Sequence, residues 1–571
     1  MRTSIFAFLI VAFGLVPCAA AQAAAPSQPL MAQARVPAYE VAVLVGGSPI
    51  HGANGLYFGP DGHLYVASVL GMELVVLDPD SGEVVDRLGA EAGVAAPDDV
   101  TFGPDGSLYW TDILTGEVGR RTPAGAVTKQ FVAMGVNPIT FSDDGRLFVA
   151  LDFLGDALFE LDPDLTGEPR PIIVASEANP YPLGFMNGFD FGPDGRLYGP
   201  LYAAHLVVSL DVDACDASSD PWADCDLRMV ADGFQVPVAA KFDAQGRLHV
   251  LDDPTGEVFV VDVTTGEKTL VVALPPQLDN LAFDADGALY VSNYGDGSVV
   301  RVRPTGGYEV VNAGGLVAPQ GLAVVRRPDG TESLFVADHF TLREFDGLSG
   351  RQRTARAGLL VGEGMTAPTT VASDGEHLVL SSLLTAAVQV WDPTQADLVA
   401  HHAFPAPLNA IRFQGDLVVA DLGLGGVVWA STGEVILVID QQQVWLPAGL
   451  ATDGERLWVA DWATGIVWQL DFDGRTPSAP VPIAADLANP EGLALDHDGS
   501  LLVVEAGAGR LSRIDLATGA VQLVADGLAL GLAGPTTLPP TFFFSGIAVD
   551  ASGAIYVSGD IDRVIYRIDA R

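Results

Sequence analysis

The sequence repeats one pattern of apolar and polar positions over almost its whole length. A typical copy runs from Asn54 through Leu-Tyr-Phe, a Gly-Pro-Asp-Gly turn and Leu64-Tyr-Val, and closely similar copies begin at Asn187 and Asp279. We count twelve copies, 39 to 54 residues apart, which open at Asn54, Asp98, Asn137, Asn187, Val238, Asp279, Gln320, Thr369, Asn409, Ala448, Glu491 and Ser545. This period is typical of the blades of β-propellers.

Each copy has the same internal order of predicted elements. A short apolar strand leads to an Asp-Gly type of turn, and a second strand such as Leu64-Tyr-Val-Ala follows. A third strand such as Leu74-Val-Val-Leu, another turn and a fourth strand such as Val84-Val-Asp-Arg-Leu complete the copy. Asp-Gly supplies the backbone conformations that a tight hairpin requires, while Val, Tyr and Leu suit a packed, pleated surface. The pattern therefore predicts one four-stranded antiparallel blade per copy.

The two ends of the repeat array complement each other. A strand-like segment, 41–45, precedes the first copy, and the last copy stops after its third strand at 563–568. A blade shared by both termini would remove an exposed sheet edge. Since twelve blades exceed the usual four to eight, we predict an all-β chain with two tandem six-bladed β-propellers, each ring closed by an N-terminal outer strand. Segment 308–312 would open the second ring as 41–45 opens the first.

The predicted domains follow from this division. They are a signal peptide (1–24), a linker (25–39), a first propeller (40–305) and a second propeller (306–571). Rings of five and seven blades, or one large ring, are the alternatives.

The N-terminus reads as a secretory signal. Arg2 supplies the positive start, 5–16 the apolar run, and 20–25 a small-residue cleavage region. No later segment is long and apolar enough to cross a bilayer, so we expect no membrane span in the mature chain. The predicted location is secreted or periplasmic.

Charge restricts the partners further. The 571 residues include 72 Asp and Glu against 29 Lys and Arg, which gives a net charge of −43. A chain this acidic is repelled by phosphate backbones and anionic lipid, so nucleic acid is excluded as a partner.

Export would place the cysteines of the mature chain in an oxidising compartment. Cys215 and Cys225 are the two that remain after the signal, and in an oxidising compartment we expect them to form a disulfide. The loop between and around them is rich in Asp, so it is either a structural calcium site or a solvated insertion; the acidic residues are Asp211, Asp213, Asp216, Asp220, Asp224 and Asp226.

Candidate metal ligands occur at the residue that opens each copy. In a propeller this position lies at the start of the inner strand, near one mouth of the central channel. Five of the six residues in the first ring carry side-chain oxygens, which suit Ca2+ or another divalent cation; the predicted ligands are Asn54, Asp98, Asn137, Asn187 and Asp279. The equivalent positions of the second ring are less acidic. A polar, water-filled axis without a metal is the alternative.

The repeat pattern resembles that of gluconolactonases and regucalcin, together with the related paraoxonases, strictosidine synthase-like proteins and NHL-repeat proteins. The resemblance implies an axial cation held by a Glu from the first blade, Asn residues from the third and fourth, and an Asp from the fifth that also acts as the base. Asn137 and Asn187 match the two Asn ligands, whereas Asn54 replaces the Glu and Val238 replaces the Asp. Asp98 and Asp279, in neighbouring blades, are the residues available to compensate.

Few other side chains could carry chemistry. His51, just before Asn54, could act as a base beside the cation, so the predicted catalytic residues are His51, Asp98 and Asp279. The Asp that follows each second strand, as in Asp112, Asp152 and Asp252, reads as a hydrogen-bonding strut between blades. Six of the eight Trp lie between Trp391 and Trp468, where packing between blades is their expected use.

Three functions remain in view. The first is a divalent-metal-dependent hydrolase of small esters or lactones at the mouth of the first propeller, acting on a small-molecule substrate. The second is a non-enzymatic NHL-like propeller that binds a protein or glycan, because a fold does not fix a function. The third is a lyase similar to streptogramin lyase.

Overall fold

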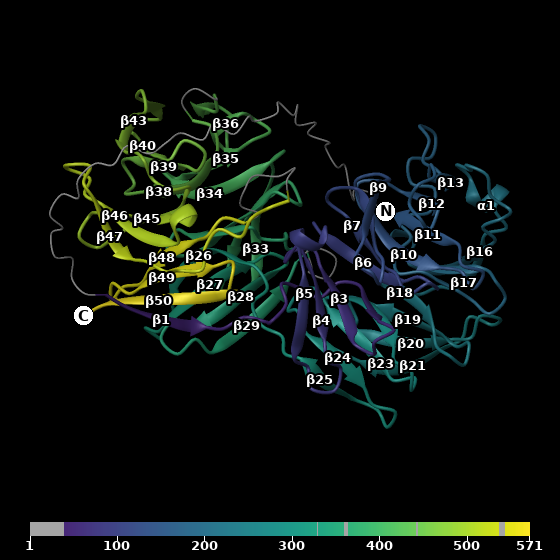
Figure 1. Cartoon of the computed structure of the whole chain (residues 1–571). Helices are drawn as coiled ribbons and strands as arrows, with labels where there is room; N and C mark the ends of the chain where they lie inside the picture. Colours follow the sequence, from purple (N-terminus) through teal and green to yellow (C-terminus); the bar gives the residue numbers. More distant parts are fainter. Residues whose placement is uncertain (1–38, 328, 359–363, 441–443, 536–542) are drawn as a thin grey trace.

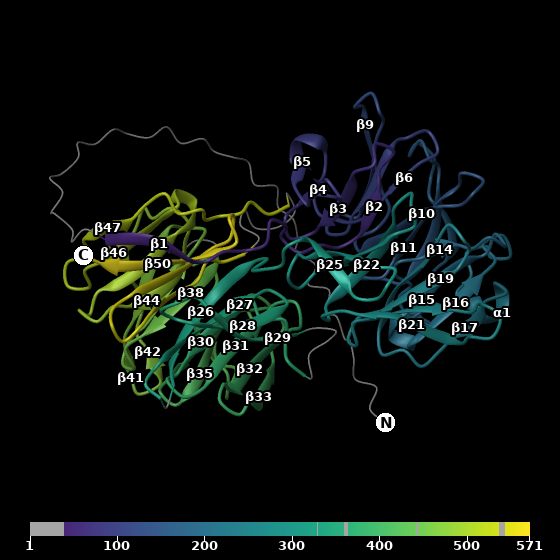
Figure 2. The same cartoon turned by 90° about the horizontal axis from the view of Figure 1, so that it is seen from below.

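The structure is a computed structural model that describes residues 39–327, 329–358, 364–440, 444–535 and 543–571. It contains two groups of β-sheets, which Figures 1 and 2 show side by side. The first group, purple to teal, holds β2 to β25, and the second, green to yellow, holds β26 to β50 together with β1. The predicted signal peptide lies outside the described residues.

The first group consists of six four-stranded antiparallel sheets, each made of consecutive strands. Their strands are β2 (Leu56–Phe58), β3 (Leu64–Ser68), β4 (Glu73–Leu77), β5 (Val84–Leu88); β6 (Pro97–Phe102), β7 (Leu108–Asp112), β8 (Glu117–Arg121), β9 (Val127–Phe131); β10 (Val136–Phe141), β11 (Leu147–Leu151), β12 (Ala157–Leu161), β13 (Arg170–Ile173); β14 (Asp190–Phe191), β15 (Leu197–Leu201), β16 (Leu206–Leu210), β17 (Arg228–Ala231); β18 (Pro237–Phe242), β19 (Leu248–Asp252), β20 (Glu257–Val261), β21 (Lys268–Ala273); and β22 (Leu278–Phe283), β23 (Leu289–Asn293), β24 (Val299–Val302), β25 (Tyr308–Asn312).

The second group also has six four-stranded sheets. Their strands are β26 (Pro319–Arg326), β27 (Glu332–Asp338), β28 (Thr341–Asp346), β29 (Gln352–Ala357); β30 (Thr370–Ser373), β31 (Leu378–Ser382), β32 (Ala387–Asp392), β33 (Asp397–Ala403); β34 (Pro407–Phe413), β35 (Asp416–Asp421), β36 (Gly426–Trp429), β37 (Val435–Val438); β38 (Pro447–Thr452), β39 (Leu457–Asp461), β40 (Ile466–Leu470), β43 (Val481–Ala484); β44 (Pro490–Leu495), β45 (Leu501–Glu505), β46 (Arg510–Ile514), β47 (Val521–Ala525); and β48 (Ile547–Val549), β49 (Ile555–Gly559), β50 (Val564–Ala570), β1 (Tyr39–Val45).

Other elements within the described residues are short. They are the hairpin β41 (Phe472–Asp473) and β42 (Thr476–Pro477), the helix α1 (Pro221–Asp224), and the 3-10 turns η1 (Ala90–Ala92), η2 (Tyr202–Ala204) and η3 (Ala506–Ala508). None of the described helices is long and apolar enough to span a membrane.

The second strand of each sheet is the most deeply buried, because both of its faces are covered. All five residues of β7, β11, β15 and β19 are buried. The fourth strands alternate instead between exposed and covered positions, as in β29 and β33. Separate apolar cores lie between neighbouring sheets, and one of them joins Phe148 and Leu158 to Leu197 and Val208. The prediction of twelve four-stranded antiparallel blades is confirmed.

The N-terminal strand β1 pairs with the C-terminal strand β50. Tyr39 lies opposite Ala570 and Val43 opposite Tyr566, so β1 forms the outer strand of the last sheet. The prediction that the two termini share one sheet is confirmed. The assignment of β1 to the first domain (40–305) is wrong, because its hydrogen-bonding partner belongs to the second group.

Strand β25 differs from the role that was predicted for segment 308–312. It pairs with β24 and so completes the sixth sheet, whereas segment 308–312 was predicted to open the second ring. The connection is a tight turn in which Arg303 N donates to Gly307 O over 2.9 Å, and Gly306 and Gly307 adopt φ values of 91° and 74°. Glycine accepts this left-handed backbone without a steric penalty, so a hairpin forms where a domain boundary was expected.

Neighbouring sheets contact each other in chain order through their first strands. In the first group β2 contacts β6, β10 contacts β6 and β14, and β18 contacts β22; β2 also contacts β22. In the second group β26 contacts β30, and it also contacts β48 of the last sheet. This pattern is consistent with two propellers.

The chain passes between the two groups along two segments that lie side by side. Ser48 N donates to Leu316 O over 2.9 Å, and Gly47 forms a parallel bridge with Leu316. Side chains extend the contact: Arg343 Nη2 donates to Gly295 O over 2.7 Å, and the rings of Tyr294 and Phe340 lie 5.2 Å apart. These contacts lie at the ends of the sheets where the first strands begin. We call this end of a sheet its mouth end.

Candidate functional site

The six residues that open the copies of the first group lie at its mouth end, and we call them the mouth set: Asn54, Asp98, Asn137, Asn187, Val238 and Asp279. Asp98, Asn137 and Val238 are buried, and the other three are partly exposed. Backbone bonds link the neighbouring sheets here, since Gly55 N donates to Asp98 O and Ala240 N to Gly188 O, each over 2.7 Å.

Hydrogen bonds join the third and fourth sheets within the mouth set. Asn137 Nδ2 donates to Asp152 Oδ2 over 3.0 Å and to Asn187 Oδ1 over 3.4 Å. The structure thus brings the two Asn predicted as ligands together. It also adds Asp152, which the sequence analysis interpreted as a strut.

Asp152 differs from the equivalent residues of other sheets. Asp112 accepts the N–H groups of Ala95 and Ala96 over 2.9 and 2.8 Å, which is the strut role that was predicted. Asp152 instead accepts from Asn137, and its Oδ1 is buried without a partner. The sequence gives no signal of this difference, because the same Asp follows the second strand in each case.

A second layer of polar groups lies one residue further along the first strands. Asp99 accepts Ile139 N over 3.1 Å and Asn280 Nδ2 over 3.3 Å, so it links the second sheet to the third and the sixth. Burial raises the pKa of Asp99 and of Asp190, and the charge of Lys241 in β18 offsets only part of this rise. The positive charge of Lys241 therefore acts on the second layer, at Asp99 and Asp190.

The carboxyl groups of the mouth end have raised pKa values. Burial, with the neighbouring Asp99 carboxyl, raises the pKa of Asp98 to about 7. Burial and the charges of Asp98, Asp99 and Asp152 hold the pKa of Asp279 well above its usual range. Burial raises the pKa of Asp253 to about 8. Among the described residues, no Lys or Arg forms an ion pair with Asp98, Asp152, Asp156, Asp253 or Asp279.

The oxygen atoms of the mouth set and of Asp152 fit a hard divalent cation only if the amide oxygens of Asn residues act as ligands. No group of three His, Cys, Asp or Glu within the described residues could hold a metal by itself. Carboxylates supplemented by Asn oxygens are ligands that Ca2+ accepts, and Asp152 Oδ1 is a buried acceptor that lacks a donor. Asp98, Asp152, Asn137 and Asn187 are therefore the residues that would hold the cation.

His51 lies elsewhere, at the contact with the second group. Its Nε2 is 3.0 Å from Asp560 O, and its Nδ1 is 2.7 Å from Arg563 Nη1. A carbonyl only accepts and a guanidinium only donates, so His51 carries its proton on Nε2. Burial and the charge of Arg563 lower its pKa to about 3. Within the described residues, none of its hydrogen bonds reaches Asp98 or Asp279.

In the second group, residues that open the copies, such as Glu491 and Gln320, form hydrogen bonds with neighbouring side chains or backbone. Glu491 accepts from Trp462 Nε1 over 3.2 Å and from Ser545 N over 2.6 Å. His339 is 3.2 Å from Gln320 Nε2, and burial lowers its pKa to about 4. The Trp residues of the second group pack mainly in cores, as expected, and the buried ones there are Trp391, Trp429, Trp458, Trp462 and Trp468.

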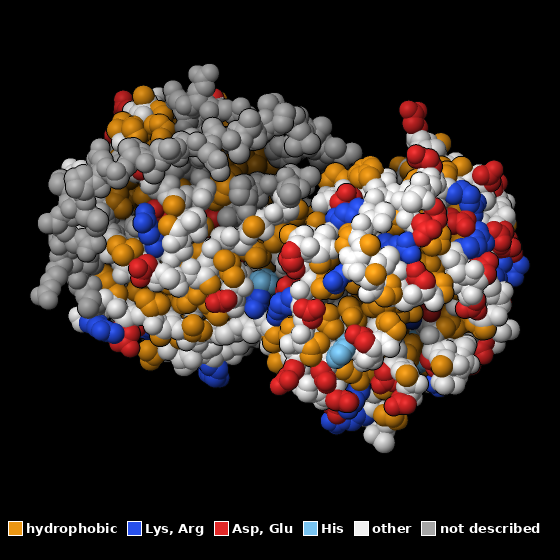
Figure 3. Space-filling view, viewed as in Figure 1, with side chains coloured by type: hydrophobic (Ala, Val, Ile, Leu, Met, Phe, Trp, Pro, Cys, Tyr) orange, Lys and Arg blue, Asp and Glu red, His pale blue; other side chains and the backbone are white. Residues whose placement is uncertain are grey.

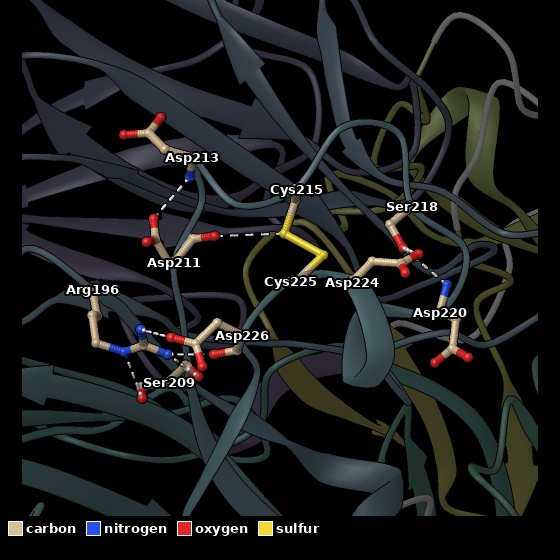
Figure 4. Close-up of a disulfide and its surroundings, with 10 residues drawn as sticks. All are labelled: Arg196, Ser209, Asp211, Asp213, Cys215, Ser218, Asp220, Asp224, Cys225 and Asp226. Atoms are coloured by element: carbon tan, nitrogen blue, oxygen red, sulfur yellow. Dashed lines mark hydrogen bonds and ion pairs between the residues drawn. A yellow bond between two sulfur atoms is a disulfide. The ribbon is translucent and has the colours of Figure 1, made fainter.

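Cys215 and Cys225 form the predicted disulfide, with their Cα atoms 4.7 Å apart. Figure 4 shows that Asp211, Asp224 and Asp226 each engage a different partner. Asp224 accepts from Ser218 Oγ over 2.8 Å, and Asp226 pairs with Arg196 over 2.9 Å. The solvated insertion is therefore the better description of this loop.

Comparison with known proteins identifies the class of the first group. Residues 99–313 match the family described as SMP-30/Gluconolactonase/LRE-like region. Over that stretch the chain is similar to this family, in agreement with the resemblance seen in the sequence. No curated protein matches the chain.

Solved structures with similar coordinates have low sequence identity. Virginiamycin B lyase from Staphylococcus aureus is 15% identical, covers 52% of this chain and 95% of its own, and gives a TM-score of 0.35. A gluconolactonase from Xanthomonas campestris is 15% identical, with coverages of 47% and 96% and a TM-score of 0.34. The extracellular domain of a putative one component system from B. thetaiotaomicron is 11% identical, with coverages of 93% and 82% and a TM-score of 0.30.

Proposed function

We propose that the protein is a divalent-metal-dependent hydrolase of small esters or lactones, with its site at the mouth end of the first six sheets. The observation that carries the proposal is the set formed by the buried carboxyls of Asp98 and Asp152 and the partly exposed carboxyl of Asp279, whose charges act on one another. Asp152 accepts from Asn137, and none of the three carboxyls has a Lys or Arg ion-pair partner in the described residues. Buried charges without compensation are costly, so such a cluster favours a bound cation.

The chain's own residues supply the remaining chemistry. A bound divalent cation would polarise the substrate carbonyl and lower the pKa of water. Asp98 would serve as the general base. It would take the proton of the water that attacks the carbonyl carbon and return it to the departing alkoxide oxygen. The charge of Asp98 acts on Asp279, and Val238 leaves the fifth sheet without a base.

The test combines metal binding with activity. We expect Ca2+ or Mn2+ to raise the melting temperature of the metal-stripped protein, and Asp98→Asn and Asn187→Ala to abolish that shift. Asp98→Asn should also lower kcat for a lactone or aryl ester by about 100-fold or more. Asp286→Asn is the control, because Asp286 is an exposed turn residue at the opposite end of the sheet that holds Asp279. A protein that binds neither metal would overturn the proposal and leave the binding module as the better interpretation.

We also infer that each group of six sheets is a closed six-bladed propeller. The contact of β2 with β22 and that of β26 with β48 support this arrangement. The boundary would then lie between Asn312 and Leu316, beyond β25. Limited proteolysis there should give two fragments that separate under denaturing conditions, because β1 stays paired with β50 in the native protein. Resistance there with cutting at another sheet boundary would favour five and seven blades.

The disulfide supports an exported location, secreted or periplasmic, because such bonds persist in oxidising compartments. Fractionation of the native host cells, with the Cys215–Cys225 bond followed by thiol labelling, tests this. Recovery of the reduced protein in the cytoplasm would contradict it.

A further inference from the structure

A cavity of about 170 Å³ lies between two neighbouring sheets of the second group, the seventh (β26 to β29) and the eighth (β30 to β33) (Figure 2). Residues of the connection from β32 to β33 line it, and this connection lies at the end of the sheet opposite the mouth end. The apolar lining belongs to the buried core between the two sheets and consists of Phe335, Leu342, Leu378 and Trp391. The polar lining is formed by Arg327, Glu344, Thr354, Arg356, Asp392 and Thr394.

The turn beside the cavity, from Asp392 to Ala396, has the same hydrogen bond as turns in five other sheets. In all six turns the N–H of the fifth residue donates to the carbonyl oxygen of the first over 2.7 to 2.9 Å. The fifth residue has a left-handed backbone in each, and outside the eighth sheet it is a glycine: Gly82, Gly266, Gly350, Gly433 and Gly519. The eighth sheet instead has Ala396, with a φ of 62°.

Glycine lets most of these turns pack directly on the fourth strand of the neighbouring sheet. A Cβ on Gly266 would lie 2.8 Å from Val230 O in β17, which is too close for a real side chain. Cβ atoms on three further glycines would also collide with a backbone carbonyl of a fourth strand, whereas one on Gly433 would meet nothing within 4 Å; the three are Gly82, Gly350 and Gly519. The usual contact between turn and strand therefore requires the absence of a Cβ.

Ala396 prevents this close contact in the eighth sheet. Its Cβ keeps the turn away from β29, the fourth strand of the seventh sheet. The space that remains between them is the cavity, because Ala396 lines it together with Thr354 and Arg356 of β29. Thr354 and Arg356 are two residues apart, so they lie on the same face of that strand. One methyl group thus explains why the two sheets leave a cavity at this place.

Arg356 is the charged lining residue that lacks a partner. Arg327 and Glu344 form an ion pair with each other. Asp392 Oδ1 accepts both the backbone N–H and the hydroxyl of Thr394 over 2.7 Å. Within the part of the chain that the structure describes, Arg356 forms neither a hydrogen bond nor an ion pair. A carboxylate would supply the missing partner, because a guanidinium donates two parallel N–H groups to its two oxygens.

The size and the lining of the cavity restrict the rest of the ligand. A cavity of about 150 Å³ lined by apolar side chains holds benzene, and this cavity is slightly larger. Trp391 Nε1 already donates to Gln389 Oε1 over 2.9 Å, so Trp391 offers its ring rather than a hydrogen-bond donor. One aryl ring that carries a carboxylate on a short arm would therefore fill the cavity and reach Arg356.

We propose that this cavity, held open by Ala396, is a binding site for a small organic monocarboxylate. The apolar body of the ligand lies against Trp391, and its carboxylate pairs with Arg356. Asp392 lines the same cavity and repels a second negative charge, which favours monocarboxylates over dicarboxylates. The site lies in the second group and does not depend on ester hydrolysis by the first.

The first test changes the charge of the ligand. In calorimetric titrations of the full chain, we expect phenylacetate to bind at least about tenfold more tightly than its neutral counterpart phenylacetamide. Arg356→Gln should remove this preference. Arg351→Gln is the matched control, because Arg351 is an exposed arginine beside β29 that does not line the cavity. A protein that does not bind phenylacetate, equal affinity for the two ligands, or equal effects of the two variants would overturn the proposal.

Asp392 provides a test with the opposite sign. Asp392→Asn keeps a side-chain oxygen that can accept the hydrogen bonds of the turn but removes the negative charge. We expect this variant to bind phenylacetate about threefold or more tightly than the wild type. Tighter binding of the cation phenethylamine than of phenylacetate by the wild type would contradict the proposal, because Asp392 and not Arg356 would then select the ligand.

Ala396→Gly tests how the cavity is held open. The variant should bind phenylacetate about tenfold or more weakly, because the turn can then move towards β29. Its melting temperature should be no lower than that of the wild type, since glycine accepts a left-handed backbone, so misfolding would not explain the loss. Ala386→Gly is the control, because Ala386 has a φ of 52° in the same sheet but lies in the connection from β31 to β32, at the mouth end. Unchanged affinity in Ala396→Gly would refute the role of Ala396.

Discussion

Single carboxyl groups in this protein take different roles according to what faces them. Asp112 accepts two backbone N–H groups, whereas Asp152, at the same place in the next sheet, faces the amide of Asn137 and keeps one oxygen unpartnered. Asp98 and Asp279 face other carboxyls, which together with burial raises their pKa values. Asp residues at equivalent positions therefore differ in their hydrogen bonds and pKa values because their neighbours differ.

His51 gives a pH-dependent prediction at this scale. Its folded pKa of about 3 is lower than the reference of 6.5, so the stability that it contributes is complete above pH 6.5 and is lost as the pH falls towards 3. Between pH 7 and about pH 4.5, we expect the wild type to lose about 2 kcal/mol more stability than His51→Gln. Gln can still donate to Asp560 O and accept from Arg563. Urea unfolding at both pH values measures the difference, and parallel losses in the two proteins would contradict it.

At the scale of elements, strands are joined by turns whose glycines differ in how much they constrain the fold. Many of these glycines adopt positive φ in open solvent, as Gly125 does at 86°. Gly135, at 91°, lies directly against Phe153 O in the connection between β9 and β10. This close approach fixes the entry into β10, and therefore the position of Asn137.

Substitutions at Gly125 and Gly135 distinguish the cost of a left-handed backbone from the cost of a steric clash. Gly125→Ala should cost about 1 kcal/mol, the cost of a left-handed alanine. Gly135→Ala adds a clash with backbone, so it should cost at least about 2 kcal/mol more. It should also weaken binding of any metal at the mouth set. Thermal unfolding and metal titration of the two variants test this, and similar losses in both would show that the connection can relax.

Strand β1 gives a second prediction at this scale. Removing residues 1–45 would leave β50 as an exposed edge. We expect the melting temperature of the second group to fall by about 5 °C or more, and aggregation to increase. Tryptophan fluorescence reports on this group, because six of the eight Trp lie between Trp391 and Trp468. A chain lacking only residues 1–38 is the control, and equal melting of the two proteins would refute a role for β1.

At the scale of the whole molecule, the two groups share an interface made of mouth-end loops. Gln277 Nε2 donates to Phe340 O over 3.3 Å, and Gln277 Oε1 accepts from Thr341 Oγ1 over 3.0 Å, next to the ring contact of Tyr294 with Phe340. Tyr294 OH in turn donates to Asp253 over 3.3 Å. The second group therefore supports residues that lie beside the proposed site.

Phe340→Ala tests this support. Losing the contact with Tyr294 should cost about 1 to 3 kcal/mol and separate thermal unfolding into two transitions, one for each group. Leu348→Ala is the control, because Leu348 is 78% exposed in the same sheet. Calorimetry measures the transitions, and a single unshifted transition in Phe340→Ala would show that the interface does not couple the groups.

The net charge of −43 is also a property of the whole molecule. Figure 3 shows acidic side chains scattered over the visible face of the first group, interspersed with basic and apolar ones. Many of the acidic residues cap turns, as Asp78 does by accepting the N–H groups of Asp80 and Ser81. The bulk of the charge is thus structural, while the mouth-end carboxyls form a small and distinct group.

The sequence by itself determined the repeat, the four strands of each copy, the sharing of one sheet by the two termini, and the Asn137–Asn187 pair. These follow from local rules, because alternation and turn residues specify strands and their order. Only the tertiary structure decided that β25 completes the sixth sheet, that Asp152 joins the site and that His51 lies at the interface. Those outcomes depend on which groups meet across hundreds of residues, as His51 and Asp560 do, and local patterns carry no information about such contacts.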